Sequence, residues 1–414
     1  MIRHLVLASA FLATLPAPTT AQTVALTGGT VFTGTGARIE NGTVLLRDGT
    51  IAAIGTNVAI PAGATRIDAT GKWITPGLIH MAANAGLGVR GLGAFGETSQ
   101  SGDVTAAFNV REGLDPDAID IPITRTGGVT TGLLVPNGNF IAGQAVIANF
   151  SGSRMEEMVV RSPAVMVINL SSAARGAGGN SRAGVLARLR QIFADAREYE
   201  ARRQDYGRAQ MRELAASPAD LEALLPVLRG ELPVMMVANR ASDIRSVIRL
   251  AEEFRLRVIL RGGVEAWKVA PDLARAGIPV ALNPMEDIPS FDGLGARLDN
   301  ATVLREAGVE VLLAHQDSGG ERNLRFGAGN AVRNGLTWND ALRSITLAPA
   351  TVLGVASQYG SLETGKVANV VIWSGDPFEF STVAEHVFIR GQDQSLHTRE
   401  TELLNRYRTL PPKY

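Results

Sequence analysis

Residues 233–262 decide the fold, and they read PVMMVANRASDIRSVIRLAEEFRLRVILRG. Two short apolar runs, VMMVA and LRVIL, lie on either side of a segment whose apolar residues recur three and four positions apart, as Ile244, Val247 and Ile248 do. That spacing is typical of one face of a helix, whereas continuous apolar runs are typical of strands covered on both faces. The stretch therefore predicts a strand, a helix and a second, parallel strand.

The same alternation extends through residues 74–358. Further apolar runs are GVTTGLLV, IPVALNP and VEVLLAH, and helical periods such as EAWKVAPDLARAG and LDNATVLREAG lie between the later ones. The span suits a (β/α)8 barrel, which typically has ~250 residues, so we predict an α/β fold with a barrel of this kind. An open doubly wound sheet is the alternative, but no GxGxxG motif follows a strand to mark its usual ligand site.

The two ends of the chain carry a different pattern. Residues 22–73 contain short runs of alternating apolar residues, and Asn41-Gly42 and Asp48-Gly49 are typical hairpin signals, which predicts an antiparallel module. Residues 359–396 return to the strand pattern in KVANVVIWSG and STVAEHVFIRG. We therefore expect a small β-sandwich domain built from both chain ends around the barrel, with a closing amphipathic helix in residues 397–414.

Composition excludes several kinds of chemistry. The 414 residues include 40 Lys+Arg and 40 Asp+Glu, so a net charge of zero gives no reason to expect a nucleic-acid partner. The chain has no cysteine, which excludes disulfides, thiolate metal ligands and cysteine nucleophiles.

The first 21 residues have the pattern of a secretory signal peptide. Arg3 supplies a positive charge, residues 5–15 form an apolar stretch too short to cross a bilayer, and small residues precede Gln22. We expect cleavage near Ala21 and a periplasmic or secreted protein. No later apolar run is long enough for a membrane span.

Several segments together resemble the amidohydrolase superfamily, the metal-dependent hydrolases related to imidazolonepropionase and dihydroorotase. DGTIAAIG followed by IDATGKWITPGLIH is similar to the entry into that family's barrel, and LTWNDALRSITLAPATVLGV followed by GSLETGKVANVVIWSGDP is similar to its exit. Between them, GGVTTGLLVPNG, IAGQAVI and residues 232–270 resemble one exported branch of the family. The resemblance covers nearly all of the chain after the signal peptide.

The resemblance implies hydrolysis of C–N bonds by one or two divalent metals that activate water, held at the carboxyl ends of the barrel strands. The first strand in that family normally ends in Gly-Leu-Ile-Asp-x-His-x-His. In residues 77–84, which read GLIHMAAN, Ala82 and Asn84 occupy the two histidine positions. Alanine cannot bind a metal, and a neutral amide is a poor ligand for zinc.

The later strands have lost the family's ligands as well. Val237 and Asn239 stand where the branch carries histidine on its fifth strand, and Gly262 stands where histidine would lie on the sixth. Of the usual ligands, only the eighth-strand aspartate has a survivor, Asp317. A catalytic zinc needs three protein ligands, so we expect no metal at the inherited site.

Two barrel histidines remain, because the others lie in the signal peptide or in the C-terminal segments. His80 lies two residues before Ala82, and His315 lies two residues before Asp317, so the members of each pair point to the same face of their strand. The first and eighth strands of a closed barrel are neighbours. His80, His315 and Asp317 are therefore catalytic candidates, as a relocated site for a divalent metal such as zinc or as an acid–base pair, and the alternative is a hydrogen-bonded polar plug.

Other polar residues follow strand ends and could line a ligand pocket. Arg261 could bind a carboxylate through two hydrogen bonds, and the favoured alternative is a salt bridge, for instance to Glu265. Asn239 and Asn84 are further ligand-binding candidates. Three more polar residues follow the seventh strand: Asn283, Glu286 and Asp287.

These observations favour a non-catalytic homologue of the amidohydrolases. We expect it to form homo- or hetero-oligomers, including assemblies with a catalytically active relative. A hydrolase of C–N bonds with a reduced or relocated site is the first alternative. The second alternative is a small-molecule binding protein that uses the mouth of the old active site.

Overall fold

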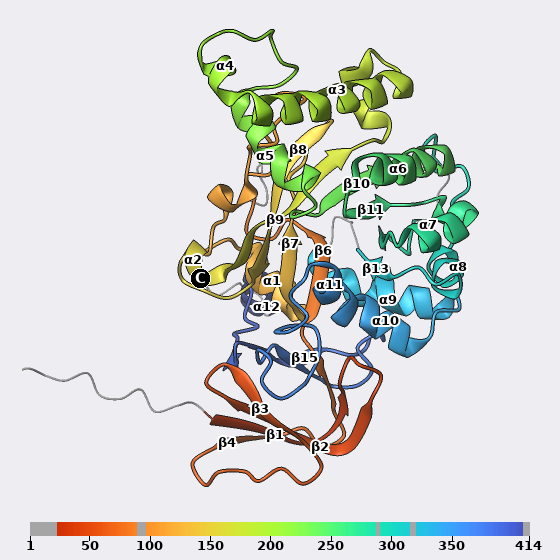
Figure 1. The fold of residues 1–414 in the computed structure, drawn as a ribbon. Helices are drawn as coiled ribbons and strands as arrows, with labels where there is room; N and C mark the ends of the chain where they lie inside the picture. The colour runs from red at the N-terminus through yellow and green to blue at the C-terminus, as the bar shows by residue number, and fades with distance from the viewer. Residues whose placement is uncertain (1–22, 89–96, 287–289, 315–319, 409–414) are drawn as a thin grey trace, which may run out of the picture.

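The computed structural model describes residues 23–88, 97–286, 290–314 and 320–408. It contains two eight-stranded sheets, one in the barrel and one built from both ends of the chain (Figure 1). In Figure 1 the composite sheet lies below the barrel, and helices surround the barrel sheet. No helix among the described residues is long and apolar enough to cross a membrane.

The barrel sheet keeps its strands in chain order, and its two end strands, β6 and β13, contact each other, so the sheet is nearly closed. The predicted α/β barrel fold is confirmed. The strands are β6 (Leu78–Ala83), β7 (Val129–Leu134), β8 (Ile141–Asn149), β9 (Val159–Asn169), β10 (Val234–Ala238), β11 (Val258–Gly262), β12 (Val280–Leu282) and β13 (Val311–Leu313).

Helices cover the outside of this sheet. Residues 233–262 form β10, α6 and β11. On α6, Ile244, Val247 and Ile248 are buried, as their spacing predicted. The helices are α1 (Asp120–Thr126), α2 (Met155–Met158), α3 (Arg182–Ala201), α4 (Arg203–Gly207), α5 (Pro218–Leu228), α6 (Ala241–Phe254), α7 (Ala270–Ala276), α8 (Asn300–Glu306), α9 (Leu324–Arg333), α10 (Trp338–Ser344), α11 (Leu347–Val352) and α12 (Arg399–Tyr407).

One strand of the barrel runs against the predicted direction. β8 pairs antiparallel with both β7 and β9, whereas the other neighbouring strands pair in parallel. Parallel neighbours need a crossover of a dozen or more residues, and the connections on either side of β8, residues 135–140 and 150–158, are too short for one. The prediction of a regular strand–helix alternation is therefore wrong between β7 and β9.

The second sheet joins the chain ends through β5 and β14, which pair antiparallel. Its strands are β1 (Thr23–Phe32), β2 (Arg38–Arg47), β3 (Thr50–Gly55), β4 (Thr65–Asp68), β5 (Trp73–Pro76), β14 (Val370–Trp373), β15 (Ala384–Ile389) and β16 (Gln392–Asp393). Asp48-Gly49 forms the β2–β3 hairpin turn as predicted, but Asn41-Gly42 lies within β2 beside a register shift. The sheet is mixed, because β4 and β5 pair in parallel with β1, which corrects the antiparallel prediction.

Buried contacts join the barrel to this sheet. The indole of Trp373 is fully buried, and its Nε1 donates a hydrogen bond to Thr75 Oγ1 at 2.8 Å. Gly128, in the turn before β7, lies against the same indole ring. Arg325 of α9 is buried and donates hydrogen bonds to three carbonyl oxygens, those of Pro377, Glu379 and Thr382. These contacts fix the base of the barrel on the composite sheet.

Candidate functional site

A cavity of about 240 Å³ opens at the carboxyl ends of the parallel barrel strands, where barrel enzymes place their active sites. Five of its lining side chains are small and apolar: Ala142, Val167, Val237, Ala281 and Ala314. Neither alanine nor valine carries a donor atom for a metal, so these positions contribute shape and no ligands.

The polar side chains of the cavity come from successive strand ends. Asn169 ends β9, Asn239 follows β10, Arg261 lies near the end of β11, and Asn283 and Glu286 follow β12. The structure thus brings together four residues that the sequence singled out, whereas Asn169 was missed. Its signal was the same as theirs, a polar residue at the end of an apolar strand.

Asn239 and Gly262 are in close contact at the position where the family carries histidine on the sixth strand. Gly262 has φ +95°, a conformation that other residues rarely adopt, and a Cβ atom there would lie 2.2 Å from Asn239 Oδ1. Asn239 Oδ1 is buried and has no hydrogen-bond partner within the part of the chain that the structure describes. A side chain at position 262 would therefore have to adopt a strained backbone and displace Asn239.

Glu265 has a structural role at this edge of the cavity. Its carboxylate accepts hydrogen bonds from the backbone N–H of Ala241 at 3.0 Å and of Gly295 at 3.0 Å, and from Lys268 Nζ at 2.7 Å. Burial alone would raise the pKa of Glu265, but these hydrogen bonds and Lys268 hold it below its ordinary value. No ion pair joins Arg261 to Glu265 among the described residues, and Glu265 accepts hydrogen bonds from these three donors instead.

Arg261 makes no hydrogen bond or ion pair with any other described residue. It is half-buried and lines the cavity. Burial lowers the pKa of Arg261 to about 10, which leaves the guanidinium charged at neutral pH. The cavity therefore contains a positive charge with five N–H donors.

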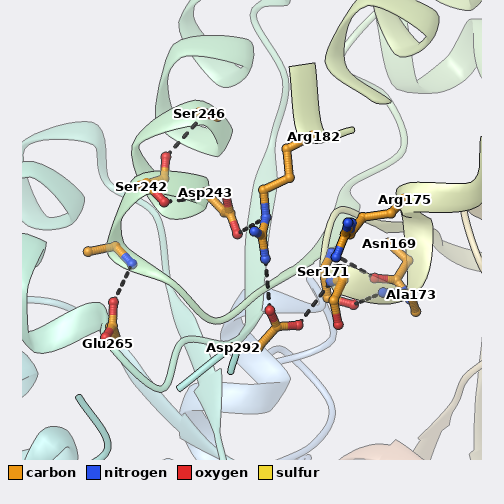
Figure 2. A network of polar contacts seen from close by, with 12 residues as sticks. Asn169, Ser171, Ala173, Arg175, Arg182, Ser242, Asp243, Ser246, Glu265 and Asp292 are labelled. Carbon is orange, nitrogen blue, oxygen red and sulfur yellow. Dashed lines mark hydrogen bonds and ion pairs between the residues drawn. The ribbon is translucent and has the colours of Figure 1, made fainter. Parts of the chain in front are cut away.

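A network of polar contacts supports the loop on one side of the cavity (Figure 2). Asn169 Oδ1 accepts a hydrogen bond from the backbone N–H of Ser171 at 2.9 Å, and Asp292 Oδ2 accepts one from the N–H of Ser172 at 2.9 Å. Arg182 of α3 forms ion pairs with Asp292 at 2.8 Å and with Asp243 of α6 at 2.9 Å. The network ties the segment after β12 to α3 and α6.

The two aspartates around Arg182 have opposite pKa shifts. Burial alone would raise the pKa of Asp292, but hydrogen bonds from Ser172 and the charge of Arg182 lower it below its ordinary value. Burial raises the pKa of Asp243, although Arg182 and Arg240 oppose the shift. The ionised form of Asp292 therefore stabilises the fold, whereas that of Asp243 carries a desolvation cost.

We expect Asp292→Asn to lower the free energy of unfolding at neutral pH by about 1.5–3 kcal/mol, the range for a lost hydrogen bond to a charged group. A carboxyl whose pKa is depressed in the fold stabilises it above the unfolded-state pKa, so the loss should shrink below about pH 4. Asp243→Asn is the control and should cost less. Urea denaturation across this pH range measures both, and equal losses at neutral pH would contradict the assignment.

The other candidate residues lie apart from the cavity or outside the described residues. His80 is buried, its Nδ1 accepts a hydrogen bond from the N–H of Ala82 at 3.1 Å, and it does not line the cavity. Asn84 also does not line it, because the chain turns away there and the N–H of Asn84 donates to Glu321 Oε1 at 2.7 Å. His315, Asp317 and Asp287 lie outside the described residues.

The described side chains of the cavity do not fit a divalent metal. Within residues 23–88, 97–286, 290–314 and 320–408, no group of three or more histidine, aspartate or glutamate side chains is placed to hold a metal ion. The cavity offers amides, one carboxylate at its rim and the guanidinium of Arg261, whose positive charge opposes a cation.

Comparisons with known proteins agree with the fold. The pattern described as the amidohydrolase family matches residues 295–397. The chain is 23% identical over 389 residues to amidohydrolase tasK of Hapsidospora irregularis, covering 85% of this chain and 40% of that protein. It is 32% identical over 169 residues to imidazolonepropionase of Pseudomonas entomophila (strain L48), covering 39% of this chain and 40% of that protein. The chain thus spans 40% of the length of each curated relative.

A solved structure extends the similarity to the whole fold. The amidohydrolase from Thermotoga maritima MSB8 is 28% identical, with a TM-score of 0.82 over 90% of this chain and 99% of that chain. The match therefore includes both the nearly closed barrel and the sheet shared by the chain ends, and few residues of either chain lie outside it. The chain belongs to the amidohydrolase superfamily, with an imidazolonepropionase-like relationship at low identity.

Proposed function

We propose that this protein is a non-hydrolytic member of the amidohydrolase superfamily that keeps the barrel-mouth cavity as a binding site for a small polar molecule. The contact between Asn239 and Gly262 carries the proposal. It closes the sixth-strand ligand position with a left-handed glycine and a neighbouring amide. The site thus differs from that of the family in its backbone conformation and packing as well as in the missing histidine.

The remaining cavity side chains support the same proposal. A catalytic zinc site needs three protein ligands and an open position for water. Val237 and Ala281 flank Arg261 in the register of the sheet, so β10, β11 and β12 present aliphatic groups and a cation to the cavity. Such a lining suits the binding of a polar molecule better than the activation of water.

Metal dependence tests this proposal. Dialysis of the full chain against a chelator, or addition of zinc or manganese, should leave the Tm unchanged, because a bound ligand stabilises a protein according to its concentration and affinity. Hydrolysis of N-acyl amino acids and dipeptides should stay at the rate without protein. A Tm that falls with chelator and is restored by zinc, together with metal-dependent hydrolysis, would overturn the proposal in favour of the hydrolase alternative.

We also propose that the protein acts outside the cytoplasm and assembles with itself or with a catalytically active relative. The signal-like pattern of residues 1–21 supports the location. The retained fold with replaced ligands supports a role as a partner subunit. Fractionation of cells that express the full chain, followed by co-purification, tests both parts, and a monomer found only in the cytoplasm would contradict them.

A further inference from the structure

We propose that the cavity binds a small carboxylate that also carries an N–H group, with the carboxylate against Arg261 and the N–H toward the carboxylate of Glu286. An amino acid is the simplest molecule of this class. The inference rests on the proposed function, because it fills the cavity with a ligand in place of a metal. Two neighbouring strands supply the two recognition groups, since Arg261 lies on β11 and Glu286 follows β12.

Arg261 has the properties of a carboxylate-binding group. A planar guanidinium can donate two parallel hydrogen bonds to a carboxylate, and such charge-assisted pairs are among the stronger polar contacts. Its neighbours across the sheet, Val237 and Ala281, are apolar, and no described residue accepts a hydrogen bond from it. The charge is half-buried in the cavity, where an anion would gain more from it than at an exposed surface.

Asn239 forms part of the cavity wall beside Arg261. Its Oδ1 is buried against Gly262 and has no hydrogen-bond partner among the described residues. An N–H group of the ligand therefore needs an acceptor elsewhere in the cavity.

Glu286 and the size of the cavity narrow the class further. Glu286 lines the same cavity, and no ion pair joins it to Arg261 among the described residues. Opposite charges held apart in one cavity suit a molecule that has a carboxylate and a basic nitrogen. A volume of about 240 Å³ is smaller than that of pockets for drug-sized ligands, which limits the ligand to a small molecule.

Calorimetric titration of the full chain with L-alanine, alaninamide and propionate tests the inference. L-alanine should bind most tightly, because alaninamide lacks the carboxylate and propionate lacks the N–H. Arg261→Met should weaken L-alanine binding at least tenfold, and Glu286→Gln should bring L-alanine and propionate closer in affinity. Arg257→Met is the matched control, since Arg257 is exposed just before the opposite end of β11.

Each other outcome overturns a stated part of the inference. If alaninamide binds as tightly as L-alanine, the site does not recognise a carboxylate. If propionate binds as tightly as L-alanine, the site does not recognise an N–H group. If inorganic phosphate binds more tightly than L-alanine and Arg261→Met abolishes its binding, the ligand is a phosphate compound and not an amino acid. If none of these probes binds and the protein contains no metal, the inference fails while the non-hydrolytic proposal stands. If the protein contains stoichiometric metal, the proposed function itself fails.

Discussion

Gly262→His, which restores the residue type that the family carries on the sixth strand, is expected to lower the free energy of unfolding by about 3 kcal/mol without creating a metal site. Holding φ near +95° costs a histidine roughly 1–3 kcal/mol, and forcing it into the space of Asn239 costs about as much again. Two other ligand positions, Ala82 and Val237, remain without donor atoms. Chemical denaturation measures the loss, and calorimetry with zinc measures metal binding.

Two variants separate the sources of this cost. Gly36→His is the matched control, because Gly36 has φ +99° and nothing within 4 Å of a Cβ atom, so it carries the backbone strain alone. Adding Asn239→Ala to Gly262→His should recover the part caused by crowding. A stable Gly262→His protein that binds zinc tightly would contradict the account of a rebuilt site.

Gly128→Ala is expected to lower the free energy of unfolding by about 4 kcal/mol. Gly128 has φ +74°, and a Cβ atom would lie 2.3 Å from Cη2 of Trp373. Backbone strain of roughly 1–2 kcal/mol adds to overpacking of about 1–3 kcal/mol, because the indole is fully buried and cannot move without losing its bond to Thr75.

Gly71→Ala is the matched control for this prediction. Gly71 has φ +75° and nothing within 4 Å of a Cβ atom, so it should lose only the strain component. Both variants are compared by denaturation in urea. Equal losses at the two positions would mean that the Trp373 contact does not hold the barrel on the composite sheet.

The barrel could be predicted because its later strands and helices have separate periodicities. Strands β9 to β13 pair in parallel, as the apolar runs between helical segments indicated. The direction of β8 could not be inferred from periodicity, because a buried strand has the same apolar pattern in either direction. Loop length carried that information, since residues 135–140 can close a hairpin but cannot hold a crossover.

The site was predictable to the extent that it follows strand ends. Arg261 and Asn239 were found because the carboxyl ends of parallel strands meet at one edge of a barrel. Asn84 follows a strand end as well, but its backbone is held by Glu321 outside the cavity lining, a tertiary contact that no local pattern indicates. The fit between Asn239 and Gly262 depends on a left-handed backbone, and a glycine in a sequence does not reveal its φ.

The metal content of the purified full chain, measured by inductively coupled plasma mass spectrometry, tests the central claim most directly. The account predicts zinc, manganese, iron and cobalt all far below one equivalent per chain, because the described cavity offers Arg261 and amides where metal ligands would stand. One or two equivalents of a divalent metal, retained through dialysis and lost with His80→Ala or Asp317→Ala, would contradict it and establish a relocated metal site.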